Sequence, residues 1–170
     1  MTSEYPKNVR IATIADKSKV LDFIRAGHEE SAVFSLSEYK INLLAEKALT
    51  REAPVWIAVI DSPEKNEIAA SICIEYCQMW YTEDWHLNEL WNNVRKEYRK
   101  SSYARDLIAF AKWLSEQANR TLAMGIITNE RVEAKMAMYR RKMPQVGAYF
   151  MWNTPDKFAL DNLGVKHGRR

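Results

Sequence analysis

Cysteine and histidine are scarce in this chain of 170 residues. The two cysteines, Cys73 and Cys77, lie four apart in a stretch that we expect to be a strand. That spacing separates them by about 13 Å, which is too far for a disulfide. The three histidines, His28, His86 and His167, are scattered and show no zinc-ligand spacing. These absences argue against a disulfide-stapled domain and a structural metal site, and they favour a reducing compartment.

Glycine and proline number five each, and no stretch approaches the roughly 20 apolar residues of a membrane span. The opening residues, MTSEYPKNVR, lack the apolar core of a signal peptide. We therefore expect a soluble, cytoplasmic protein. The net charge of +3 is too small to predict a broad nucleic-acid surface.

The composition is typical of a globular protein, with 47% hydrophobic and 28% charged residues, and the sequence contains no repeat. Its length suits one domain. We expect a single domain over residues 1–153 and a C-terminal tail over residues 154–170, which ends in the basic sequence KHGRR.

The N-terminal half predicts a strand, two helices and a hairpin. Residues 8–13 suit a short strand, and Asp16 is a suitable cap for the helix that follows. A second helix is expected over residues 37–49. The segments PVWIAVID and EIAASICIEY are rich in β-branched residues and flank the turn-forming SPEKN, so they predict a β-hairpin.

The second half begins with a strand over residues 86–95. Its alternation places Leu87, Glu89, Trp91 and Asn93 on one face, and Leu90 and Val94 on the other. A helix then starts near Ser102, because apolar residues recur at helical spacing from there to Ala118. TLAMGII predicts a short buried strand, residues 129–143 a helix ended by Pro144, and VGAYFMW a last strand. This order of elements predicts a mixed α/β fold.

The stretch YRKSSYARD, residues 98–106, joins a strand to this helix and combines basic with small side chains. A helix N-terminus leaves backbone N–H groups without partners and carries a partial positive charge, so it binds phosphate readily. Arg99 and Lys100 strengthen that field, while Ser101, Ser102 and Ala104 leave the backbone accessible. The alternative to phosphate binding is that these basic residues are simply exposed to solvent before a helix with a side-chain cap.

This stretch resembles the phosphate loop of the GNAT superfamily of acyl-CoA N-acyltransferases, in which Arg or Gln is followed after two residues by Gly, x, Gly or Ala. Arg99, Ser102 and Ala104 match that pattern, and Ser102 stands where the family usually has glycine. The resemblance covers roughly residues 7–152. It implies a central, mostly antiparallel sheet flanked by helices, with one splayed pair of parallel strands, and acetyl-CoA as the acyl donor.

The resemblance also implies particular residues. The strand before the loop would offer backbone groups to the pantetheine arm of the donor. Asn129 resembles an asparagine that often precedes the family's catalytic tyrosine, and the alternative is that it caps the helix that follows it. The implied cofactor-binding residues are Asn93, Val94, Arg95, Arg99, Lys100, Ser101, Ser102, Tyr103, Ala104 and Asn129.

Two residues are candidates for proton transfer. Tyr139 matches the tyrosine that protonates the departing thiolate, a step that a phenol can perform; the alternative is a half-buried core tyrosine. Glu89 is the candidate general base, and the alternative is an exposed glutamate at a strand edge. Glu75, Glu83 and Asp84 are less specific alternatives that could attract a cationic amine.

The sequence therefore predicts an N-acetyltransferase that moves an acetyl group directly from acetyl-CoA to an amine on a small molecule or a protein. A competing hypothesis is a GNAT-like binding or virion-assembly protein without turnover, because the glycine-poor sequence also looks like bacteriophage-encoded members. The aromatic segment QMWYTEDWHL is a candidate wall of the acceptor pocket or a homodimer contact; core packing is the simpler interpretation.

Overall fold

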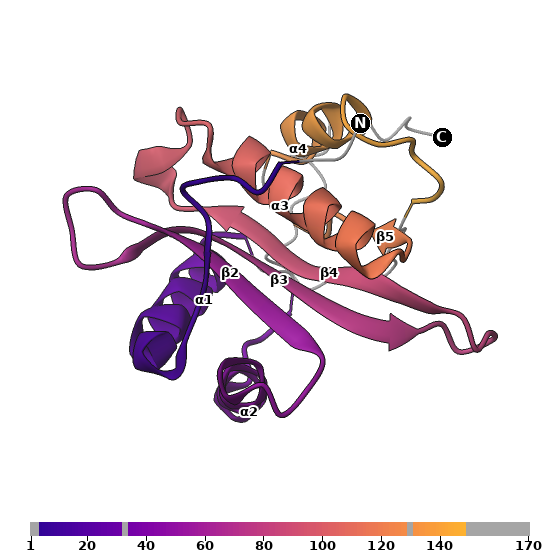
Figure 1. Ribbon diagram of the computed structural model, residues 1–170. Helices are drawn as coiled ribbons and strands as arrows, with labels where there is room; N and C mark the ends of the chain where they lie inside the picture. The colour runs from indigo at the N-terminus through magenta and orange to yellow at the C-terminus, as the bar shows by residue number, and fades with distance from the viewer. Residues whose placement is uncertain (1–3, 32–33, 129–130, 149–170) are drawn as a thin grey trace, which may run out of the picture. The chain divides into compact units, whose positions relative to one another are not determined.

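The computed structural model describes residues 4–31, 34–128 and 131–148 (Figure 1). These residues divide into two compact units. The first contains the residues up to Ala26 together with Ser37–Met124, and the second contains Gly27–Leu36 together with the residues from Gly125 onward. The predicted extent of the domain, 1–153, remains a prediction, and the predicted tail lies outside the described residues.

A five-stranded sheet in the order β1-β2-β3-β4-β5 forms the centre of the first unit. Its strands are β1 (Arg10–Ile11), β2 (Val55–Asp61), β3 (Ile68–Gln78), β4 (Trp85–Val94) and β5 (Leu122–Ala123). Neighbouring strands are antiparallel except for β4 and β5, which are parallel. The predicted mixed α/β fold with one parallel strand pair is confirmed.

Helices cover both faces of this sheet (Figure 1). One face packs against α1 (Lys17–Ser31) and α2 (Glu38–Thr50), through Val20, Phe23 and Leu49 on the helices. The other face packs against α3 (Tyr103–Ala118), through Leu107, Phe110 and Ala111. The periodic apolar residues that predicted α3 are therefore its buried face.

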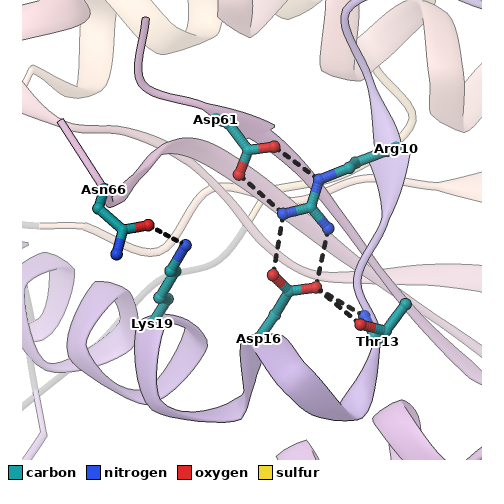
Figure 2. Close-up of polar contacts among 6 residues, drawn as sticks. All are labelled: Arg10, Thr13, Asp16, Lys19, Asp61 and Asn66. Atoms are coloured by element: carbon teal, nitrogen blue, oxygen red, sulfur yellow. Dashed lines mark hydrogen bonds and ion pairs between the residues drawn. The ribbon is translucent and has the colours of Figure 1, made fainter. Parts of the chain in front are cut away.

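A charged network holds the first strand to the start of α1 (Figure 2). The Arg10 guanidinium donates to both carboxylate oxygens of Asp16, at 2.8 and 2.9 Å, and to those of Asp61 at the end of β2, at 2.6 and 2.8 Å. Asp16 also accepts a hydrogen bond from the Thr13 amide at 2.8 Å. Thr13 is the N-cap of the short 3₁₀ turn η1 (Ile14–Asp16) that leads into α1. Asp16, the residue expected to cap the helix, is the last residue of this turn and directly precedes Lys17 of α1.

The later elements match the prediction less fully. The helix expected over residues 129–143 is α4 (Val132–Arg140) in the second unit, and it ends before Pro144. The strand expected from TLAMGII is limited to the two residues of β5. The last strand is expected from VGAYFMW. Its residues Val146–Ala148 form no strand, and the other residues of this segment lie outside the described ranges. Among helices in the described ranges, none is both long and apolar enough to cross a bilayer.

Candidate functional site

A β-bulge changes the direction of the side chains halfway along β4. Glu89 pairs with Ile74 of β3, but the next pair along the chain is Trp91 with Cys73, so Leu90 is an extra residue on β4. Leu87 consequently packs on the α3 face, whereas Trp91 packs on the α1 and α2 face. The prediction that Leu87 and Trp91 share a face is wrong, because a bulge shifts the alternation by one residue.

The bulge turns Asn92 and Val94 toward the α3 face, the face that Glu89 occupies before it. Asn92 pairs with Ile72, and Val94 packs in the cluster around Leu107 and Phe110. Asn93 pairs with Ser71 and lies on the opposite face, the one that carries Trp91. Glu89 is half-buried rather than exposed at a strand edge. The bulge thus allows both halves of the strand to present residues to one face.

β4 extends well past its parallel neighbour. Its pairing with β5 is confined to Leu87 with Leu122 and Asn88 with Ala123, and the Leu87 amide donates to the Thr121 carbonyl at 2.8 Å. β5 ends at Ala123, whereas β4 continues to Val94. The far end of β4 therefore leads to the beginning of α3 without β5 beside it.

The chain that joins β4 to α3 is tied to the sheet. The Arg95 amide donates to the Ala69 carbonyl at 2.9 Å, and its Nε to the Ile68 carbonyl at 2.8 Å. Its guanidinium lies 5.5 Å from the centre of the Phe23 ring. Arg95 therefore anchors the end of β4 to β3, a role that the resemblance did not imply.

The two basic residues of the loop differ in exposure. Arg99 is half-buried, and its Nε donates to the Val94 carbonyl at 3.3 Å. This contact folds the loop back onto the end of β4. Lys100 is exposed, so its ammonium is available to solvent and to a ligand. Both remain predicted cofactor-binding residues.

The first turn of α3 offers backbone donors. Ser101 Oγ donates to the Tyr98 carbonyl at 2.6 Å and accepts the Tyr103 amide at 3.2 Å. The amides of Ala104 and Arg105 have no carbonyl available one turn earlier within the helix. Within residues 4–31, 34–128 and 131–148 no other acceptor for them is found. With the helix dipole, these two amides make the corner attractive to an anion.

Ser102, which stands in the usual glycine position, has an ordinary helical backbone with φ −80° and ψ −5°. Glycine is thus not required by the backbone conformation here. The Ser102 hydroxyl donates to Asp106 Oδ2 at 2.6 Å, and the Asn8 side-chain amide donates to the same oxygen at 2.8 Å. The serine side chain is therefore held toward Asp106.

The composition of this corner fits a phosphate-bearing group. Residues 99–106 carry three cations, Arg99, Lys100 and Arg105, against the one carboxylate of Asp106. Ser101, Ser102 and Ala104, beside these two amides, have small side chains. We name the stretch from Asn93 to Asp106 the β4–α3 junction.

The acidic candidates lie on two parts of the β3–β4 hairpin. Glu75 accepts a hydrogen bond from the Asn88 side chain at 2.9 Å, so it is engaged within the sheet. Glu83 and Asp84 are exposed near the turn of the hairpin. Glu89 lies between these groups and the β4–α3 junction along the strand.

The remaining predicted residues lie elsewhere in the chain. Tyr139 is half-buried on α4, in the second unit, and its carbonyl accepts the amides of Lys142 and Met143 where the helix ends. Asn129 lies outside the described residues. The other predicted cofactor-binding residues, from Asn93 to Ala104, all lie in the first unit, whereas Tyr139 lies in the second unit.

Sequence reasoning missed Asn8 and Asp106. The spacing of Ser102 and Asp106, four residues apart at the start of a helix, is a local signal that could have identified their contact. The contact of Asn8 with Asp106 joins residues 98 apart and leaves no local signal.

Solved acetyltransferase structures share this fold. A possible acetyltransferase from Clostridium difficile 630 matches 85% of this chain and 94% of its own, with 18% identity and a TM-score of 0.65. A GNAT family acetyltransferase from Staphylococcus aureus matches 85% and 96%, with 12% identity and a TM-score of 0.59. The glucosamine-6-phosphate N-acetyltransferase of Arabidopsis thaliana matches 85% and 95%, with 14% identity and a TM-score of 0.61.

No family model and no curated protein sequence matches the chain. The structural likeness is nevertheless extensive in both directions. The described chain therefore has the GNAT acetyltransferase fold, as the resemblance implied.

Proposed function

We propose that the protein is an N-acyltransferase that takes an acetyl group from acetyl-CoA and transfers it to an amine. The observation that carries the proposal is the β4–α3 junction, where the amides of Ala104 and Arg105 have no acceptor among the described residues and lie beside exposed Lys100. The fold shared with solved acetyltransferases supports the same reaction class.

Backbone and basic groups of the junction would hold the donor. The Ala104 and Arg105 amides, with Lys100 and Arg99, suit its diphosphate, because they combine directed N–H groups with positive charge. Asn93 and Val94 are proposed to bind its pantetheine arm. When bound, acetyl-CoA supplies an activated thioester and a thiolate leaving group. Holding both reactants side by side is expected to provide much of the rate.

Two residues are proposed to move protons. The Glu89 carboxylate accepts the proton of the attacking ammonium, directly or through water, which makes the amine nucleophilic. The Tyr139 hydroxyl donates a proton from Oη to the leaving sulfur, a role proposed from the resemblance alone. The acceptor is an amine, the group that the name of the Arabidopsis protein also specifies. A screen of amines would identify which amine the protein acetylates.

One observation favours a second candidate function, a GNAT-like binding or assembly protein without turnover. The Asp106 carboxylate lies in the first turn of α3 and accepts a hydrogen bond from the Ser102 hydroxyl. A negative charge at this position weakens the attraction of the corner for a diphosphate. Absence of acetyl-CoA binding would favour this alternative over the enzyme.

The test is CoA release from acetyl-CoA in the presence of a panel of amines, including amino sugars, polyamines and peptide lysines. For an active amine, Tyr139→Phe is expected to lower kcat at least tenfold, since general-acid catalysis typically contributes a hundredfold or more. The affinity for acetyl-CoA should stay the same, because the phenyl ring is retained.

Tyr39→Phe is the matched control, because Tyr39 is exposed on α2 and has no proposed role. Its kcat should equal that of the wild type. An unchanged kcat in Tyr139→Phe removes that tyrosine from the mechanism. Release of CoA with none of the amines contradicts the enzyme itself.

A further inference from the structure

The β3–β4 hairpin has an unusual charge pattern. The whole chain has 25 Lys and Arg among 170 residues, about one in every seven. No Lys or Arg occurs between Lys65 and Arg95, the stretch that contains β3, the turn and β4. The same stretch contains five carboxylates, of Glu67, Glu75, Glu83, Asp84 and Glu89. A chain that is basic overall therefore carries a locally acidic hairpin.

Exposed aromatic rings accompany these carboxylates at the end of the hairpin. The exposed fractions are 94% for Trp80, 69% for Tyr81 and 45% for Trp85, and Met79 is exposed beside them. We call Met79, Trp80, Tyr81, Glu83, Asp84 and Trp85 the aromatic tip. Large aromatic side chains gathered in solvent mark interaction surfaces more often than single exposed apolar residues do.

The tip extends beyond the neighbouring strands of the sheet. β2 pairs with β3 only as far as Glu75, and β5 pairs with β4 only at Leu87 and Asn88. Cys77 and Gln78 therefore pair only with His86 and Trp85, past both neighbouring strands. Figure 1 shows this end of the hairpin beyond the β3 arrowhead, where β3 leads into β4. A partner can reach this end of the hairpin from several sides.

Hydrogen bonds and ring stacking hold the tip in one conformation. The Gln78 side chain donates to the Glu83 carbonyl at 2.6 Å, and the Thr82 hydroxyl accepts the Asp84 amide at 3.1 Å. The Trp85 ring stacks on Tyr76 with centroids 4.8 Å apart. The rings are thus presented by an ordered turn, and binding would cost little additional conformational entropy.

We propose that the aromatic tip docks a lysine- and arginine-rich segment of another polypeptide. Neither Glu83 nor Asp84 forms an ion pair with any residue in the described part of the chain, so both carboxylates can pair with incoming cations. The faces of Trp80 and Tyr81 attract ammonium and guanidinium groups and cover their methylene stems. The charges of the tip and of such a segment are complementary.

A second copy of this chain fits the tip less well. A symmetric pairing of two tips would bring the carboxylates of Glu83 and Asp84 of both copies together, and like charges at an interface are costly. The proposal does not depend on acyl transfer, because it concerns a surface at the opposite end of β4 from the β4–α3 junction.

The test uses a short fluorescein-labelled peptide of alternating lysine and glycine, and fluorescence anisotropy of the full chain. The peptide should bind, and its affinity should fall with added salt. A peptide with glutamine in place of lysine should bind at least about tenfold more weakly. Trp80→Ala and the pair Glu83→Gln with Asp84→Asn should each weaken binding about fivefold or more.

Matched controls separate the tip from general surface effects. Tyr39→Ala removes another exposed aromatic ring, and Glu52→Gln with Glu64→Gln removes two exposed carboxylates from other turns. Both controls should bind the lysine peptide within about twofold of the wild type. Equal losses in the controls, or equal binding of the glutamine peptide, overturn the proposal. Sedimentation that shows a dimer lost in Trp80→Ala also overturns it, and assigns the tip to self-association.

Discussion

Asp16 shows how one carboxylate connects three elements of the first unit. Its oxygens accept hydrogen bonds from Arg10 of β1 and from the Thr13 amide at the start of η1, while Arg10 also binds Asp61 of β2 (Figure 2). The Asp16 side chain is only 10% exposed. The hydrogen bonds from Arg10 hold the pKa of Asp16 below its ordinary 3.8, at about 2.

The first prediction follows from this lowered pKa. A carboxyl with a folded-state pKa below its unfolded value stabilises the fold above the unfolded pKa, and this stabilisation is lost as the pH falls toward about 2. At pH 7, Asp16→Asn should lower the free energy of unfolding by about 1 to 2 kcal/mol, a figure reduced for the partial exposure of Arg10. Urea unfolding of both proteins from pH 7 down to pH 2 measures the difference.

The difference should shrink below about pH 4, where Asp16 begins to be protonated in the unfolded state. Asp22→Asn is the control, since Asp22 pairs with Arg25 at the exposed surface, and it should change stability by less than about 0.5 kcal/mol. A pH-independent effect of Asp16→Asn would contradict the proposed charge interaction.

Ser102 is the residue at which the β4–α3 junction departs from the GNAT pattern. Its helical backbone needs no glycine, and its hydroxyl is directed to Asp106. We therefore attribute the serine to the anchoring of Asp106 and Asn8 at the start of α3. This explanation implies that the serine side chain does not crowd a bound diphosphate.

The second prediction tests that explanation with Ser102→Gly, and with Ser102→Ala as a control that keeps the β-carbon. Each should lower the free energy of unfolding by about 1 to 2 kcal/mol, because a hydrogen bond to a carboxylate is lost. The affinity for acetyl-CoA, measured by calorimetry, should stay within about threefold. A tenfold tighter complex with Ser102→Gly alone would mean that the serine does crowd the ligand.

At the scale of elements, the bulge at Leu90 determines which side chains β4 presents to each layer. Trp91 reaches the α1 and α2 face, and its Nε1 donates to Ser71 Oγ at 3.2 Å. Leu87 and Val94 both reach the α3 face although they are an odd number of residues apart. A regular strand could not satisfy both layers with this sequence.

The third prediction is that deletion of Leu90 destabilises the protein by about 3 kcal/mol or more, because one half of β4 must turn its side chains to the wrong face. Leu90→Ala is the matched control. Since Leu90 is 38% exposed, this substitution should cost less than about 1 kcal/mol. Guanidinium unfolding measures both, and a deletion no more costly than the substitution would contradict the account of the bulge.

The sequence predicted the elements whose patterns are local. Helix α3, helix α2 and the hairpin of β2 and β3 follow from helical periodicity, β-branched composition and turn residues. The bulge escaped prediction because an extra residue interrupts alternation without any proline or glycine to mark it. Similarly, TLAMGII suggested a longer strand than β5, since an apolar run does not show where pairing stops.

At the scale of the whole molecule, the order of elements predicted a mixed α/β fold, and the resemblance to the GNAT superfamily implied the sheet with one parallel strand pair; both are confirmed. The small and basic side chains of Arg99–Ala104 lie, as expected, at the start of α3, and their role in binding a cofactor stays a prediction. The contact of Asn8 with Asp106 and the tie of Arg95 to Phe23 could not be predicted, because they join distant parts of the chain. Tyr139 remains a prediction, since it lies in the second unit.

Charge is distributed unevenly over the first unit. The residues from Arg95 to Arg105 are rich in cations, whereas the hairpin before them has none from residue 66 to residue 94. An anionic donor would be attracted to one end of β4 and a cationic partner to the other. Neither preference is visible in the net charge of +3.

The most direct test of the central claim is thermal unfolding with and without acetyl-CoA. A ligand at a hundred times its dissociation constant adds roughly 2.7 kcal/mol, which for a chain of this size raises Tm by about 5 to 10 °C. We predict such a rise, and a smaller one when Lys100→Ala and Arg99→Ala weaken the junction. An unchanged Tm at millimolar acetyl-CoA would contradict the claim that the amides opening α3 bind this donor.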